Sequence, residues 1–200
     1  CSNCGYESLR WIGKCPECES WNSFTEEIVE TSPRKANISK SRFSYNKILD
    51  ISANEDDRIK TGIIEFDRVL GGGIMPGSVI LLGGDPGIGK STIAMQAAAS
   101  IKEKVLYVTG EESEKQIKLR SGRLKVKSDS FFVQAETELS NILGAIKELS
   151  PSVVIIDSIQ TTYRSELENS PGTITQIREC AAMLMEEAKK KHFCVIVIGH

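Results

Sequence analysis

The sequence predicts an α/β fold in which helices connect the strands of a mainly parallel sheet, preceded by a small cysteine-rich module. Five apolar runs have the length and the β-branched or aromatic content of buried strands: Val79–Leu82, Val105–Val108, Phe131–Val133, Val153–Ile156 and Val195–Ile198. Three stretches show the three-and-four spacing of an amphipathic helix: 93–101, 139–149 and 174–188. Strands that alternate with helices form βαβ units, whose ligands bind at the carboxyl ends of the strands.

Three parts follow one another along the chain. Residues 1–30 form the cysteine module, and residues 31–57 are polar and turn-rich, which is typical of a linker. Residues 58–200 contain all the predicted strands and form the α/β domain. Because His200 directly follows an apolar strand, we expect this domain to be truncated at its carboxyl-terminal end.

Composition narrows the function classes. The 200 residues carry 25 Lys and Arg against 27 Asp and Glu, so no overall basic field indicates a nucleic-acid partner, although local patches can still bind one. No apolar run approaches the roughly 20 residues of a membrane span, and no signal peptide is visible. Four of the six cysteines lie within the first 18 residues, which favours a local metal site in a reducing compartment. We therefore expect a cytoplasmic protein with no membrane partner.

A phosphate-binding loop follows the first predicted strand. The G-x-x-x-x-G-K-[ST] pattern is complete and opens a helix: Gly84, Asp85, Pro86, Gly87, Ile88, Gly89, Lys90 and Ser91. The glycines let backbone N–H groups turn toward phosphates, and the helix adds its positive end. We expect Lys90 to neutralise the β- and γ-phosphates of ATP, Ser91 to ligate Mg²⁺, and Thr92 to lie near the α-phosphate. A glycine-rich turn that binds nothing is the alternative.

Two further acidic elements follow predicted strands. Asp157 ends a buried strand, where it can hold Mg²⁺ through water; the alternative is a turn or N-cap residue. Glu111 and Glu112 follow the strand at 105–108, which we expect to end beside the phosphate loop, where a carboxylate could polarise the attacking water. The alternative for this pair is the acidic first turn of a helix, and the chemistry alone does not separate the two.

The cysteine module has the spacing of a zinc site. Two C-x-x-C pairs, Cys1 with Cys4 and Cys15 with Cys18, are separated by ten residues and can place four thiolates around Zn²⁺. So small a module needs a metal to fold, whereas a redox function, the alternative, needs only one pair. The aromatic side chains could stack nucleic-acid bases or, as we favour, form the module's own small core: Trp11, Trp21 and Phe24.

Together these residues resemble the bacterial RadA/Sms family of DNA repair proteins. The resemblance rests on the four-cysteine start with GYES at 5–8, TGIIEFDRVLGGGI at 61–74, GGDPGIGKST at 83–92, YVTGEES at 107–113 and the final IGH at 198–200. It covers nearly the whole chain outside the linker. The phosphate loop alone would not distinguish this family from many others, but the combination does.

The resemblance implies a RecA-like ATPase core that works as a homo-hexameric motor on single-stranded DNA and branched recombination intermediates, in concert with the RecA recombinase. By position, Glu111 matches the catalytic glutamate, and His200 matches a polar residue that senses the γ-phosphate. Residues between Asp157 and Thr173, including Tyr163 and Arg164, match a DNA-facing loop. The family's KNRFG motif and Lon-protease-like domain would lie beyond His200, so we expect ring formation only of a longer chain.

Two other functions stay open at this point. One is a nucleotide-switched signalling ATPase of the same superfamily, which generally lacks a cysteine module; the other is a zinc-ribbon interaction module without motor activity. DNA contacts would have to come from local basic residues, although for each one alone an ordinary solvated charge is the favoured interpretation: Arg120, Arg123, Lys125, Lys127 and Arg164. We expect His192, Cys180 and Cys194 to be structural.

Overall fold

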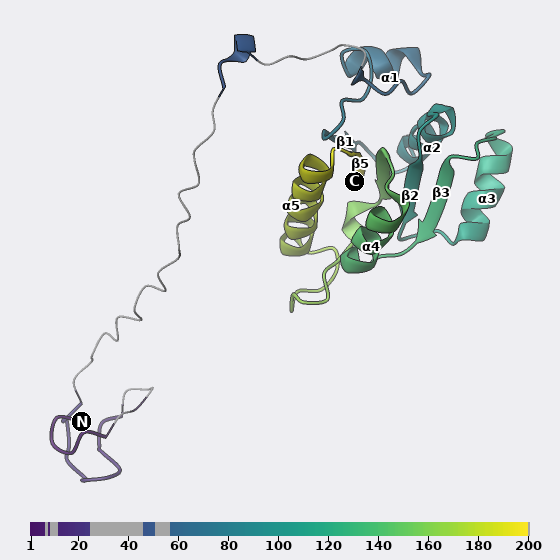
Figure 1. The fold of residues 1–200 in the computed structure, drawn as a ribbon. Coiled ribbons are helices and arrows are strands. Elements are labelled where there is room, and N and C mark those ends of the chain that lie inside the picture. Colours follow the sequence, from purple (N-terminus) through teal and green to yellow (C-terminus); the bar gives the residue numbers. More distant parts are fainter. Residues whose placement is uncertain (7, 9–11, 25–45, 51–56, 200) are drawn as a thin grey trace. The chain divides into compact units, whose positions relative to one another are not determined.

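The structure is a computed structural model that describes residues 1–6, 8, 12–24, 46–50 and 57–199. The chain separates into two compact units, Cys1–Ile51 and Ser52–His200 (Figure 1). Most of the predicted linker, residues 31–57, lies outside the described residues, as do Trp11 and His200. A short 3-10 helix, η1 (Ile48–Asp50), belongs to the first unit.

The second unit is built on a five-stranded parallel sheet. Its strands occur in the order β1-β5-β4-β2-β3 across the sheet, and all four neighbouring pairs are parallel. Each predicted strand is present and one or two residues longer than its apolar run: β1 (Val79–Gly83), β2 (Val105–Thr109), β3 (Phe131–Ala135), β4 (Val153–Asp157) and β5 (Cys194–Gly199). The α/β prediction is confirmed.

Helices connect the strands, and three of them coincide with the predicted amphipathic stretches: α2 (Lys90–Ser100), α4 (Leu139–Leu149) and α5 (Ile174–Lys191). The sequence reasoning missed α1 (Ile64–Val69) and α3 (Glu114–Arg123). Helix α3 buries only Ile117 and Ser121, so it has no apolar stripe to detect. A capping box formed by Ser113 and Gln116 marks its start and is a signal that could have found it.

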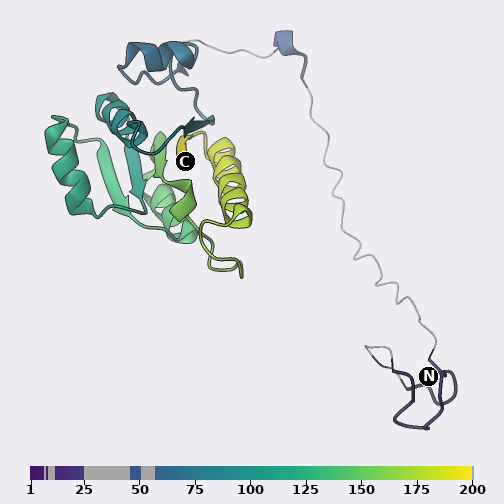
Figure 2. The same cartoon turned by 180° about the vertical axis from the view of Figure 1, so that it is seen from behind.

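Alternating side chains on the central strands supply two separate cores. On one face Tyr107 and Ile155 pack with α2, α3 and neighbouring residues, and on the other face Leu106 and Ile156 pack with α4 and α5. Figure 2 shows the same layers from behind. Strands β2, β4 and β5 are buried at every position, which explains their continuous apolar sequences.

Parallel strands bring their carboxyl ends to one edge of the sheet, called here the carboxyl edge. The phosphate loop follows β1 at this edge, residues 110–113 follow β2, and Asp157 ends β4. One expectation is corrected by the strand order. Strand β2 does not end beside the phosphate loop, because β5 and β4 lie between β1 and β2. Glu111 is instead a direct neighbour of the Asp157 strand.

Candidate nucleotide site and metal centre

The phosphate loop has a backbone that requires glycine. Gly87 and Gly89 adopt φ values of 81° and 105°, in the left-handed region that disfavours other residues. Gly89 is also the N-cap residue of α2, so the loop runs directly into the amino end of an 11-residue helix. Residues 84–88 are exposed, which leaves the loop accessible to a ligand. Backbone N–H groups and the helix dipole favour an anion at this point.

Lys90 is a buried cation inside this loop. The residue is 6% exposed, and its Nζ atom donates hydrogen bonds to the carbonyl oxygens of Gly84 at 2.6 Å and Asp85 at 2.9 Å. Within the described part of the chain, Nζ contacts carbonyl oxygens and no carboxylate. A buried ammonium without an opposite charge attracts an anion, which is what a phosphate-binding lysine needs.

Asp157 ends β4 with one carboxylate oxygen already engaged. The hydroxyl of Tyr107, on the adjacent strand β2, donates a hydrogen bond to Oδ2, and Nη2 of Arg120 lies 3.8 Å from the same atom. Burial and the neighbouring Asp157 charge raise the pKa of Tyr107, so its hydroxyl keeps its proton and donates. Both contacts reach Oδ2, so Oδ1 is the oxygen that can serve a cation. Asp157 is therefore neither a turn residue nor an N-cap, because it is the last residue of β4. The N-cap of the following 3-10 helix, η3 (Ile159–Thr161), is Ser158.

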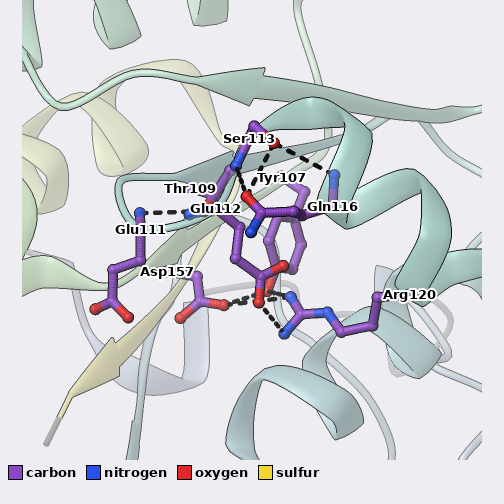
Figure 3. A network of polar contacts seen from close by, with 8 residues as sticks. All are labelled: Tyr107, Thr109, Glu111, Glu112, Ser113, Gln116, Arg120 and Asp157. Atoms are coloured by element: carbon purple, nitrogen blue, oxygen red, sulfur yellow. Dashed lines mark hydrogen bonds and ion pairs between the residues drawn. The ribbon is translucent and has the colours of Figure 1, made fainter.

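Glu111 and Glu112 diverge although they are adjacent in the sequence. Figure 3 shows Glu112 reaching the Arg120 guanidinium, while the Glu111 side chain lies on the other side of Asp157. Oε1 of Glu112 is 3.0 Å from Nη1 of Arg120, and Oε1 of Glu111 accepts a hydrogen bond from the Ser158 hydroxyl at 3.0 Å. Neither glutamate belongs to the first turn of α3, which begins at Glu114 after the Ser113 N-cap. They occupy the loop after β2.

The segment after Asp157 is anchored to two helices. The side chain of Gln176 in α5 is fully buried and bonds to the backbone N–H and carbonyl of Arg164. Glu138, the N-cap of α4, accepts hydrogen bonds from the backbone and hydroxyl of Ser165. The guanidinium of Arg164 pairs with Glu166, so little of its charge is available at the surface. Residues 158–173 carry one basic side chain and two carboxylates, Glu166 and Glu168, which gives this segment no excess positive charge.

The other basic residues predicted as possible DNA contacts are not available at the nucleotide site. Arg120 is 19% exposed and is committed to the Glu112 and Asp157 carboxylates. Three basic residues are exposed, but they lie at or just after the carboxyl end of α3: Arg123, Lys125 and Lys127. They therefore lie at the opposite edge of the sheet, where β3 begins.

The four predicted zinc ligands converge. The Sγ atoms of Cys1, Cys4, Cys15 and Cys18 all lie within 4.8 Å of one another. Two of the separations join one C-x-x-C pair to the other, 3.7 Å from Cys1 to Cys18 and 3.6 Å from Cys4 to Cys15. A tetrahedral zinc with Zn–S bonds of about 2.3 Å requires S···S distances of roughly 3.8 Å, so the four thiols fit one ion. A redox pair within one C-x-x-C would not need this arrangement.

The surroundings of the cysteines agree with a metal-dependent module. Cys15 is the only buried residue among those that the structure describes in the first 24. Hydrogen bonds with the side chain and backbone of Ser20 lower the pKa of Cys18 to about 6, toward the thiolate form that binds metals. Trp21 is 71% exposed, so our preference for a core role is wrong for this residue.

The remaining cysteines have a different character. Cys180 and Cys194 are fully buried in the second unit, and burial raises the pKa of each thiol to about 11. A neutral, enclosed thiol is unreactive. His192 is the left-handed C-cap of α5. All three residues have the structural positions expected of them.

Comparison with known proteins agrees with these two units. The ATPase family model described as KaiC matches residues 59–139, and the zinc-ribbon model described as rubredoxin metal binding domain matches residues 1–26. The DNA repair protein RadA of Bacillus subtilis is 47% identical over the whole of this chain, and that of Pseudomonas aeruginosa is 40% identical. The chain spans 45% of the length of each of these relatives.

The resemblance to RadA proteins is thereby confirmed along the whole chain. A solved structure, the crystal structure of the RadB recombinase, matches with a TM-score of 0.53 and 28% sequence identity, over 70% of this chain and 69% of the other. The predicted fold class is confirmed as well: a RecA-like P-loop ATPase core with a parallel sheet, together with a small zinc ribbon. The structure describes no helix that is both long and apolar enough to cross a membrane.

Proposed function

We propose that this chain is the ATP-hydrolysing part of a DNA repair and recombination protein. The observation that supports this most is the carboxyl edge. There the buried Lys90, which donates to carbonyl groups, lies in the phosphate loop, Asp157 ends β4, and Glu111 follows β2. Relatives named DNA repair protein RadA share 40–48% of the residues over the whole chain. In this proposal residues 58–200 form the ATPase domain, and residues 1–30 form a ribbon held by Zn²⁺ on its four cysteines.

Each part of the phosphate loop has a role in the proposal. The backbone N–H groups cradle ATP, Lys90 neutralises its β- and γ-phosphates, and Thr92 lies near the α-phosphate. The Ser91 hydroxyl and Oδ1 of Asp157 supply the hard oxygen ligands that Mg²⁺ prefers. When bound, this ion neutralises charge on the phosphate oxygens. The complete binding set is Gly84, Asp85, Pro86, Gly87, Ile88, Gly89, Lys90, Ser91, Thr92, Asp157 and His200.

Glu111 is the proposed catalytic carboxylate. It lies beside Asp157, and it accepts a hydrogen bond from a neutral hydroxyl, that of Ser158. Its carboxylate can exchange that hydroxyl for a water molecule. It accepts the water's proton as the water oxygen bonds to the γ-phosphorus and the bond from the γ-phosphorus to the oxygen of the departing ADP breaks. Glu112 is paired with a guanidinium and would have to give up an ion pair to do the same.

The proposed DNA substrates, partner and oligomeric state rest on the similarity to the RadA relatives. We propose that the full-length protein is a cytoplasmic homo-hexamer that binds single-stranded DNA and branched recombination intermediates, promotes branch migration, and acts with the RecA recombinase. His200 would report the γ-phosphate to the segment that follows it. Since residues 158–173 carry no excess positive charge, DNA affinity in this segment would rest on few phosphate contacts.

A nucleotide-switched signalling ATPase is the second candidate, because the KaiC model matches residues 59–139. ATP turnover with and without single-stranded DNA separates the two, in a protein of the relatives' full length that contains this chain. The DNA-coupled motor predicts turnover that single-stranded DNA increases several-fold. Turnover that DNA leaves unchanged would favour the signalling ATPase, and absence of turnover would leave the zinc ribbon as an interaction module.

A further inference from the structure

Arg120 is a partly buried guanidinium that joins three groups at the carboxyl edge. Nη1 lies 3.0 Å from Oε1 of Glu112, and Nη2 donates to the Tyr107 hydroxyl at 3.2 Å and lies 3.8 Å from Oδ2 of Asp157 (Figure 3). The side chain is 19% exposed, and its buried Nε has no hydrogen-bond partner among the described residues. Arg120 thus gives up one hydrogen bond in order to hold these contacts.

The local structure directs Arg120 to this place. Thr109 Oγ1 accepts hydrogen bonds from the backbone N–H groups of Glu111 and Glu112, and the Ser113 capping box then starts α3. Arg120 lies about two turns further along this helix. Long helical side chains point back toward the amino end, which carries the guanidinium to the loop before the helix.

We propose that Arg120 is a positioning residue with two effects on the nucleotide site. It holds the Glu112 carboxylate away from the phosphates, so that Glu111 alone can reach the water. Together with Tyr107 it also occupies Oδ2 of Asp157, which directs Oδ1 toward the Mg²⁺ position. The inference rests on the proposed ATPase function, and it explains how two adjacent glutamates acquire different roles.

The planar shape of the guanidinium is essential to this role. Two Nη atoms at a fixed separation can bind Glu112 and the Tyr107–Asp157 pair at the same time. A lysine ammonium is a point charge that would favour one partner over the other. The partial burial of Arg120 and of Asp157, 12% exposed, keeps water from screening these contacts fully.

The test compares Arg120→Met, Arg120→Lys and the double variant Arg120→Met/Glu112→Gln, with Lys115→Met on the exposed face of α3 as the matched control. Two quantities are measured: ATP turnover, and the affinity for a fluorescent ADP analogue with and without Mg²⁺. Arg120→Met is expected to lower turnover by about 10- to 100-fold, as a misplaced catalytic group does. Its affinity without Mg²⁺ stays normal, and the gain in affinity on adding Mg²⁺ shrinks.

The double variant isolates the Glu112 part of the proposal. If a released Glu112 interferes, replacing it by the neutral Gln recovers part of the turnover lost in Arg120→Met. The turnover of Arg120→Lys is expected to lie between those of wild type and Arg120→Met. The proposal is overturned if the affinities with and without Mg²⁺ fall by the same factor, or if the double variant is no faster than Arg120→Met. A wild-type protein that hydrolyses no ATP would refute the proposed function. The affinity for the ADP analogue does not depend on hydrolysis, so comparing it with and without Mg²⁺ would still test the role of Arg120.

Discussion

The ammonium of Lys90 is bound by the carbonyl oxygen of Gly84, six residues earlier in the same loop, at a distance of 2.6 Å. The phosphate loop therefore holds its own cation in the place where a phosphate is expected. Since these carbonyl contacts are neutral, a triphosphate can replace them with stronger, charge-assisted hydrogen bonds. The first prediction follows from this relationship.

Lys90→Ala should greatly weaken ATP binding and lower turnover by roughly 10²- to 10³-fold, because a preorganised positive group at the transferred phosphoryl is lost. Lys102→Ala, an exposed lysine after α2, is the control and should behave as wild type. Turnover and ATP affinity are measured separately. Near-normal turnover in Lys90→Ala would refute the assignment of the phosphate loop.

Cys15→Ser should abolish the bound zinc and unfold the module at 1–30, while nucleotide binding stays intact because the two units are separate. Cys180→Ala removes a thiol from the core of the second unit and should retain one zinc per chain. Metal analysis of protein purified without chelators measures both. Wild-type protein without zinc would contradict the four-cysteine site.

Gly110→Ala should destabilise the second unit by about 1–3 kcal/mol, because the new methyl group overpacks the end of β2. An added Cβ would lie 2.0 Å from Thr161 Oγ1 and 2.9 Å from Thr137 Cγ2. Gly144→Ala, in α4 with open space around it, should instead stabilise the fold by up to about 1 kcal/mol. Urea unfolding measures both free energies. Equal effects of the two substitutions would show that the Thr161 contact is not there.

Single-stranded DNA affinity should fall as salt rises, but with a shallow slope, since residues 158–173 contain one basic side chain. If this segment contacts DNA, Arg164→Ala should reduce the slope of log affinity against log salt by about one. Lys147→Ala, in the last turn of α4, should leave the slope unchanged. Equal slopes for wild type and Arg164→Ala would place the DNA contacts elsewhere.

The fold was largely predictable because its central strands are buried on both faces. Continuous apolar runs such as Val153–Ile156 are typical of strands covered by helices on both sides, and the three amphipathic helices each contribute buried residues to one of the two cores. Helix α3 was not predicted, because its one buried aliphatic side chain, Ile117, leaves no periodic pattern. The place of β2 in the sheet was not predicted correctly, since two strands that come later in the chain, β4 and β5, separate it from β1.

The candidate site was predictable where one motif contains all its members. The phosphate loop and the four cysteines are local patterns, and the structure brings each set together. The contacts of Tyr107 and Arg120 with Asp157 join residues 50 and 37 positions apart, which no local motif contains. Arg120 was therefore predicted to be a surface charge, solvated or in contact with DNA, whereas it pairs with the carboxylates of Glu112 and Asp157.

The most direct test of the account compares Glu111→Gln with Glu112→Gln, because the central claim is that Glu111 activates the hydrolytic water. ATP binding and turnover are measured separately for each variant. Glu111→Gln should bind ATP normally and lose roughly 10²- to 10⁴-fold in turnover, while Glu112→Gln should keep a larger share of its turnover. If Glu112→Gln is the variant that binds ATP without hydrolysing it, and Glu111→Gln turns over normally, the two roles are reversed and the account is wrong.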